Sequence, residues 1–340
     1  MADRATPPYP TPPEGAPLRL AFVGQQTYFR ACALDEDSPR VTTTFIEYRS
    51  GRDPALMRSQ LAAFSPHVVV VFRPETVPAG LLADLPAPIL GFLTEPISRS
   101  TEGGALHWDL EERRRALAQM DRANVDRLVS FDPLIIPTVD EVMEVWRSLP
   151  IPVADRLYRP VERVKGVPKM LFVGRSTVHR ERFLIDVKHR FDCLHVAFGI
   201  QVDELEHLLD THQITFNIHN EPYPSFENRV LLHLAAGHLV ISEPLSPTHG
   251  LEPGFDYLEV QHPEDLLAIA TEARAFPDAF HRVRVRGRQK AELVRASRVW
   301  PALVRDLFAD VAAFGTHRTV AGRGGDGVAV GGAATAAAAA

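Results

Sequence analysis

A short apolar run in the second half of the chain is followed by a turn rich in cations and hydroxyls. Residues 171–180 read Leu-Phe-Val-Gly-Arg-Ser-Thr-Val-His-Arg. Guanidinium groups bind phosphate oxygens in pairs, and backbone N–H groups at the start of a helix attract anions. This spacing predicts a diphosphate-binding site at Gly174, Arg175, Ser176 and Arg180. The alternative interpretation is a helix cap flanked by two arginines on the surface.

A polar loop further along the chain offers a second set of ligand contacts. Residues 217–229 read Asn-Ile-His-Asn-Glu-Pro-Tyr-Pro-Ser-Phe-Glu-Asn-Arg and follow another apolar run. Enzymes with parallel sheets place their ligand contacts at such strand exits. We predict contacts to a nucleotide or sugar at Asn217, Asn220, Ser225, Phe226, Glu227 and Asn228, and we place His219 with the catalytic residues. The alternative is that Ser225 and Glu227 only cap the next helix.

Two strand exits in the first half could hold a second reactant. The apolar run at 89–93 ends in Thr-Glu-Pro, which puts Glu95 at the exit. A carboxylate there can act as a general base or bind an acceptor hydroxyl, although a glutamate before proline can also be an exposed turn residue. Gly24 and Gln25 follow the first apolar run, where a glycine lets a ligand approach closely. Two further exits, at Arg73 and Asp132, are interpreted as structural.

All of these residues require parallel strands that end at a common edge. Apolar runs predict strands at 18–23, 44–48, 67–72, 89–93, 128–131, 170–173, 214–218, 239–242 and 257–260. Periodic or capped segments predict helices at 53–64, 109–124, 179–191, 226–236 and 263–275, with a closing helical stretch at 278–314. The alternation predicts an α/β protein with two Rossmann-like, doubly wound domains that face a cleft.

Prolines and low-complexity ends mark the predicted boundaries. A proline-rich stretch around 149–160 interrupts the alternation and is typical of an interdomain connection. The predicted units are a disordered Pro-rich tail at 1–16, an N-terminal acceptor domain at 17–153, a C-terminal nucleotide-sugar domain at 154–295, a closing helix at 296–315 and a disordered Gly/Ala-rich tail at 316–340.

The composition narrows the class of protein. The 340 residues carry a net charge of -6, with no concentrated basic face, which argues against a nucleic-acid partner. Only two cysteines are present, and no apolar run has the length of a signal peptide or a membrane span. The histidines do not have metal-binding spacing, so no metal site is predicted. We therefore expect a cytoplasmic protein.

The C-terminal pattern as a whole resembles a known family. The segment 225–243 reads Ser-Phe-Glu-Asn-Arg-Val-Leu-Leu-His-Leu-Ala-Ala-Gly-His-Leu-Val-Ile-Ser-Glu, and it is followed by Gly-Leu-Glu-Pro-Gly at 250–254 and Pro-Glu-Asp-Leu at 263–266. Together with Val-Gly-Arg at 173–175 and Leu-Tyr-Arg-Pro at 157–160, it is similar to the C-terminal domain of GT-B glycosyltransferases (glycosyl transferases group 1), with bacterial CgeB-like spore-maturation proteins as the nearest group. The resemblance covers about 150–275, and the N-terminal half only by architecture.

The resemblance implies transfer of a sugar from a nucleoside-diphosphate donor to a saccharide or small-molecule acceptor, without a metal or other cofactor. Arg175 and Arg180 would then hold the diphosphate. The sequence departs from the family at Pro224 and Leu232, where many relatives carry a pair of glutamates. Ribose recognition would fall to Glu227 or Glu243, or donor binding is altered or lost. A catalytically silent domain, or a sugar-nucleotide epimerase or hydrolase, is the alternative.

Overall fold

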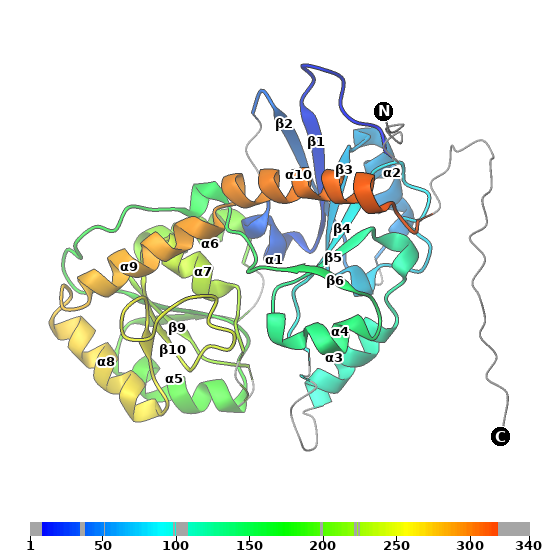
Figure 1. Cartoon of the computed structure of the whole chain (residues 1–340). Coiled ribbons are helices and arrows are strands. Elements are labelled where there is room, and N and C mark those ends of the chain that lie inside the picture. The colour runs from blue at the N-terminus through cyan, green and yellow to red at the C-terminus, as the bar shows by residue number, and fades with distance from the viewer. Residues whose placement is uncertain are drawn as a thin grey trace, which may run out of the picture.

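Two parallel β-sheets, one in each half of the sequence, form the framework of the chain (Figure 1). They are seen in a computed structural model that describes residues 9–34, 38–50, 52–97, 99, 108–197, 200–220, 223 and 225–318. Both sheets are built from strands that alternate with helices. The prediction of two Rossmann-like, doubly wound domains is confirmed.

The first sheet has six strands in the order β2-β1-β3-β4-β5-β6. Their bounds are β1 Leu18–Gly24, β2 Val41–Glu47, β3 Val68–Phe72, β4 Ile89–Leu93, β5 Arg127–Ser130 and β6 Val145–Ser148. The accompanying helices are α1 Gln26–Phe29, α2 Pro54–Phe64, α3 Trp108–Ala118 and α4 Ile136–Asp140. The central strands β3 and β4 are buried at every position. Unbroken apolar runs are typical of such strands, because both faces of the sheet are covered.

The second sheet has five strands in the order β11-β10-β9-β7-β8. Their bounds are β7 Met170–Val173, β8 Cys193–Val196, β9 Ile214–Asn217, β10 Leu239–Ser242 and β11 Leu258–Glu259. The helices of this half are α5 Val178–Arg190, α6 Val202–Thr211, α7 Arg229–Ala235, α8 Pro263–Ala275 and α9 His281–Ala291. All the strand pairs in it are parallel, so β7 and β9 end at one edge.

The closing helix, α10 (Ala296–Phe314), leaves the C-terminal half and crosses over the N-terminal sheet (Figure 1). Its Trp300 is fully buried and lies 5.1 Å from the Phe22 ring and 6.0 Å from the Phe92 ring. The indole N–H of Trp300 donates a hydrogen bond to the Cys32 carbonyl at 2.9 Å. The helix is therefore part of the packing of the N-terminal domain and ties the two halves together.

Parts of both predicted tails are packed, which corrects the expected disorder of 1–16 and 316–340 at their inner ends. Tyr9 is 3% exposed and donates a 2.6 Å hydrogen bond to Asp126. Arg318 forms a 2.6 Å ion pair with the same carboxylate, and both side chains are fully buried. The composition of the tails predicts disorder. It does not reveal this packing, because the partners of Tyr9 and Arg318 lie more than a hundred residues away in the sequence.

Other differences from the sequence-based prediction are helix α6, which no predicted helix covers, the start of α7 and two edge strands. The helix predicted at 226–236 begins at Arg229, and Ser225 is not its cap, because its hydroxyl faces the His219 ring instead. Strands β6 and β8 have no predicted counterpart; both lie at sheet edges and are only partly buried, so they lack a clear apolar run. No helix in the described part of the chain is long and apolar enough to cross a membrane.

Candidate active site

A cavity of about 870 Å³ lies between the two domains, at the ends of their strands. The N-terminal half lines it with residues between Gln25 and Gln119, and the C-terminal half with residues between Val173 and His233. Ten of the predicted site residues line it: Gln25, Glu95, Gly174, Arg175, Arg180, Asn220, Ser225, Phe226, Glu227 and Asn228. Four do not: Gly24, Ser176, Asn217 and His219. The cavity has the place that ligands take in open α/β folds.

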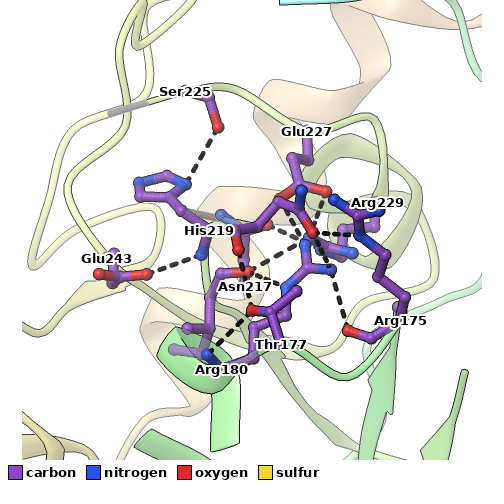
Figure 2. Close-up of polar contacts among 12 residues, drawn as sticks. Arg175, Thr177, Arg180, Asn217, His219, Ser225, Glu227, Arg229 and Glu243 are labelled. Atoms are coloured by element: carbon purple, nitrogen blue, oxygen red, sulfur yellow. Dashed lines mark hydrogen bonds and ion pairs between the residues drawn. The ribbon is translucent and has the colours of Figure 1, made fainter. Parts of the chain in front are cut away.

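Two arginines that line this cavity, Arg180 and Arg229, join the ends of β7 and β9. Figure 2 shows their polar contacts. Arg180 donates to the carbonyls of Ile218 (2.9 Å) and Arg175 (3.1 Å). Arg229 donates to the carbonyls of Val173 (2.7 Å) and Ile218 (3.3 Å). Each guanidinium therefore links the strand ends, and diphosphate binding by Arg180 stays a prediction. Arg229 is a cation that the sequence prediction missed, because it was taken only as the end of the polar loop.

Gly174 is required by these two arginines. A Cβ atom at Gly174 would lie 2.8 Å from Nη1 of Arg229 and 3.2 Å from Nη1 of Arg180. The glycine at the end of β7 thus leaves room for the paired guanidinium groups rather than for a ligand alone.

Arg175 differs from this pair. Only its Nε has a partner, the Asn220 side-chain oxygen at 2.8 Å, and its terminal nitrogens have none among the described residues. The neighbouring Ser176 donates to Glu181 at 2.6 Å and does not line the cavity, so the structure does not support its prediction as a phosphate ligand. Thr177 caps α5 through the N–H of Arg180, so the helix cap of the alternative interpretation is present, but Arg180 is buried and not on the surface.

Glu227 lies between the guanidinium groups of Arg180, which is buried, and Arg229, which is 13% exposed. It accepts from Nη2 of Arg180 at 2.8 Å and forms an ion pair with Nη2 of Arg229. Burial by itself would raise the pKa of Glu227, but the charges of Arg229 and Arg180 outweigh burial and hold that pKa below its ordinary value. Burial lowers the pKa of Arg229 to about 10. Both groups are charged at neutral pH.

His219 is not placed for catalysis, which corrects the prediction. It is 3% exposed, and its ring nitrogens face the Pro244 carbonyl (2.9 Å) and the Ser225 hydroxyl (3.1 Å). Its backbone N–H donates to Glu243 at 2.7 Å. Burial also lowers the pKa of His219, which favours the neutral ring. The residue fixes the polar loop to the segment after β10.

Asn217 and Glu243 also act behind the cavity wall. Asn217 is 1% exposed, accepts from Nε of Arg229 at 2.9 Å and donates to Ser242 at 2.8 Å. It therefore orients an arginine rather than contacting a ligand. The Glu243 carboxylate accepts a hydrogen bond from the backbone N–H of His219 and contacts the ring of His179. Of the two residues predicted as alternatives for ribose binding, Glu227 and Glu243, only Glu227 lines the cavity.

The sequence departs from the family pattern at Leu232 and Pro224, and the structure describes only the first of these residues. Leu232 lines the cavity and makes its wall apolar at that point. Pro224 lies outside the described residues. No group of three His, Cys, Asp or Glu side chains suited to a metal ion occurs in the described part of the chain.

On the N-terminal wall, Glu95 lies between two arginines. Its carboxylate is 3.6 Å from Nη1 of Arg73 and 3.2 Å from Nε of Arg113. Arg73, which was predicted to have a structural role only, lines the cavity in a left-handed backbone conformation with φ of 60°. Such conformations in non-glycine residues are found preferentially at functional sites. The sequence feature that could have identified Arg73 as a site residue is its position directly after β3. Glu95 was predicted from the same kind of position after β4.

Glu75 is a further wall residue that the sequence did not indicate. It accepts from Nε of Arg73 at 2.9 Å, while its Oε2 is buried without a hydrogen-bond partner. Burial raises the pKa of Glu75 despite the neighbouring charge of Arg73. The pair holds the Arg73 guanidinium beside Glu95.

Two buried histidines of the C-terminal half, His233 at the cavity wall and His238 next to it, make stability depend on pH. His233 and His238 are each 1% exposed, with their Nδ1 atoms 3.1 Å apart. Burial lowers the pKa of His238 to about 4 and that of His233 well below its ordinary value. An unfolded histidine, with a pKa of about 6.5, takes up a proton before the folded one does, so stability falls as the pH drops from about 6.5 towards 4.

The His238→Asn variant is expected to remove part of this pH dependence. The pKa difference for His238 corresponds to a loss on the order of 3 kcal/mol at pH 4. Urea midpoints at pH 7 and pH 4.5 should lie closer together in the variant than in the wild type. His189→Asn, an exposed position on α5, should leave the difference unchanged. An undiminished difference in His238→Asn would show that other groups control it.

Comparison with known proteins places the fold. No protein-family model and no curated protein matches the sequence. Among solved structures, HepE from Anabaena in complex with UDP-glucose is 8% identical, with a TM-score of 0.57 over 86% of this chain and 100% of that chain. An alpha-glucosyltransferase in complex with UDP-glucose and DNA containing an abasic site is 10% identical, with a TM-score of 0.52 over 86% and 99%. Sucrose-phosphate synthase from Thermosynechococcus elongatus is 14% identical, with a TM-score of 0.50 over 85% and 89%. The chain thus has the two-domain fold of GT-B glycosyltransferases.

Proposed function

We propose that this chain is a glycosyltransferase that moves a sugar, of the hexosyl type, from a nucleoside-diphosphate donor to a saccharide or small-molecule acceptor, without a metal. The observation that carries the proposal is Arg175: its terminal nitrogens are unpartnered among the described residues, and it lines the interdomain cavity beside the Arg180–Arg229 pair. A guanidinium with free terminal N–H groups is suited to paired phosphate oxygens. The solved structures of the same fold that contain UDP-glucose support this choice of ligand.

The chemistry of the proposal is electrostatic. Sugar transfer breaks the bond between the anomeric carbon and the diphosphate, so negative charge grows on the departing group. Fixed cations at that place stabilise the transition state more than the ground state. Arg175 would contact the diphosphate directly, and the positive charge of Arg180 and Arg229 would add to the field. Asn220, Ser225, Phe226 and Asn228 line the same wall and are proposed to contact the donor.

The acceptor is proposed to bind against the N-terminal wall. Glu95 would accept the proton of the acceptor hydroxyl, which then attacks the anomeric carbon. Tyr28 lines the cavity there and is 56% exposed, so it offers an aromatic face to a sugar ring. Gln25 completes this wall.

We also propose a cellular location and a related protein group for this chain. We infer a bacterial, cytoplasmic enzyme akin to the CgeB-like group, with no nucleic-acid partner. The two cysteines, Cys32 and Cys193, are free thiols, which suits a reducing compartment.

A catalytically silent domain is the second candidate. The apolar wall at Leu232 favours it, because a ribose hydroxyl would find no carboxylate at that point. The two candidates differ in a single assay: both bind a nucleoside diphosphate, but only the enzyme releases it from a nucleotide sugar in the presence of acceptors.

The first experiment is a thermal-shift and calorimetric screen against UDP, GDP, TDP and ADP. A ligand that binds only the folded state raises its apparent stability. Stabilisation by one nucleotide would support the donor site and identify the base. The matching nucleotide sugar is then incubated with a saccharide panel, and product analysis separates transfer from epimerisation and hydrolysis. Absence of binding to all four would contradict the proposal.

The Arg175→Ala variant is expected to bind the selected nucleotide about 10–100-fold more weakly, since hydrogen bonds to charged groups contribute about 1.5–3 kcal/mol. Its thermal midpoint should stay near that of the wild type, because Arg175 is only half-buried. Calorimetry measures the change. Arg182→Ala, which removes an exposed arginine from α5, is the matched control. Wild-type affinity in Arg175→Ala would remove this residue from the donor site.

A further inference from the structure

Neutral oxygens hold the Arg180–Arg229 pair in addition to its charged partner, Glu227. Six hydrogen bonds to neutral oxygens hold the two guanidinium groups: those from Arg180 to the carbonyls of Ile218 and Arg175 and to the Asn220 amide, and those from Arg229 to the carbonyls of Val173 and Ile218 and to the Asn217 amide. These acceptors belong to β7, β9 and the turns that follow them. The orientation of both cations is therefore set by the sheet.

Glu227 is the charged partner that the two guanidinium groups share. Its two carboxylate oxygens are divided between the cations, with Oε1 on Arg180 and Oε2 on Arg229. The Glu227 side chain is 27% exposed and lines the cavity, whereas the Arg180 side chain is 3% exposed. The carboxylate therefore lies on the cavity side of the guanidinium pair, where an incoming anion would have to bind.

The carboxylate has the same chemistry as the proposed ligand. It presents two anionic oxygens to two guanidinium groups, as a phosphate does. With Glu227 charged, the three arginines of this wall and Glu227 carry a net charge of +2; without it they carry +3. A carboxylate a few ångströms from a bound diphosphate also repels it directly.

We infer that Glu227 is an internal competitor for the anion site, which occupies the Arg180–Arg229 pair until a nucleoside diphosphate takes its place. The inference rests on the proposed donor site and assigns a second, gated part to it: Arg175 offers the permanently open contact, and the buried pair becomes available when Glu227 moves aside. The group displaced is a carboxylate, so the ligand class is a diphosphate or another compact polyanion.

The test compares the wild type with Glu227→Gln, which keeps the size of the side chain and removes its charge. The variant is expected to bind the nucleoside diphosphate selected from UDP, GDP, TDP and ADP about tenfold more tightly or better. Inorganic pyrophosphate should show the same gain, because it carries the charge without base or ribose. The corresponding nucleoside without phosphate should show none.

Two further variants control for an unstable Glu227→Gln protein and for the change in net charge. Glu227→Ala removes the charge without requiring an amide to fit between two arginines, and it should show the same direction if Glu227→Gln is unstable. Glu272→Gln changes the net charge equally at an exposed position on α8, and it should bind as the wild type does.

The outcomes separate this inference from the proposed function. Tighter binding in either Glu227 variant, including binding that appears only in the variant, supports it. Equal or weaker binding in the variants, with a wild type that binds, overturns the inference and leaves the glycosyltransferase proposal standing. If no form binds any of these nucleotides or pyrophosphate, the donor site itself fails and both are overturned.

Discussion

Glu95→Gln is expected to slow sugar transfer by about 10²–10⁴-fold, the usual contribution of a general base. Glutamine keeps the shape of the side chain but cannot accept the proton of the acceptor hydroxyl. Donor affinity should change little, because Glu95 belongs to the N-terminal wall, across the cavity from Arg175. The neighbouring Arg73 and Arg113 still have other partners to hold them.

The measurement is the turnover of the nucleotide sugar with the acceptor that product analysis identifies, together with nucleotide binding by calorimetry. The loss should appear in kcat and kcat/KM alike if the interaction is made in the transition state. Glu111→Gln, on the exposed side of α3, is the matched control. An unchanged turnover rate in Glu95→Gln would dismiss it as the base and direct attention to Glu75, whose buried Oε2 has no partner.

Arg318→Ala is expected to lower the free energy of unfolding by about 3–5 kcal/mol, because it removes one member of a fully buried ion pair. The Asp126 carboxylate would stay buried with only neutral partners, the hydroxyls of Tyr9 and Thr316 and the backbone N–H of Ile89. The guanidinium also satisfies the carbonyls of Leu82 and Ala87, which would lose their donor.

Tryptophan fluorescence in urea is a suitable probe for this variant. The three tryptophans lie in α3, β6 and α10, all of which belong to or pack on the N-terminal domain. Arg305→Ala, an arginine of α10 with a 76% exposed side chain, should change stability by less than about 0.5 kcal/mol. A midpoint for Arg318→Ala equal to that of this control would show that the terminal contacts do not stabilise the domain.

The sequence by itself determined the features that depend on neighbours along the chain. The bounds of β4, β7, β10 and α8 were predicted as the structure has them, because unbroken apolar runs and a proline at the first helical position are local signals. The places where strands end also follow from the sequence. Since ligands of parallel sheets collect there, ten of the fourteen predicted site residues line the cavity.

The task of each residue was decided by tertiary contacts. Arg175 and Arg180 are the same residue type in the same motif, yet the carbonyl of Ile218 and the carboxylate of Glu227 engage one and leave the other open. His219 has the sequence context of a catalytic histidine but turns to Pro244. A side chain's hydrogen-bond partners come from strands that are distant in sequence, so the motif sets which group is available and the fold sets what it binds.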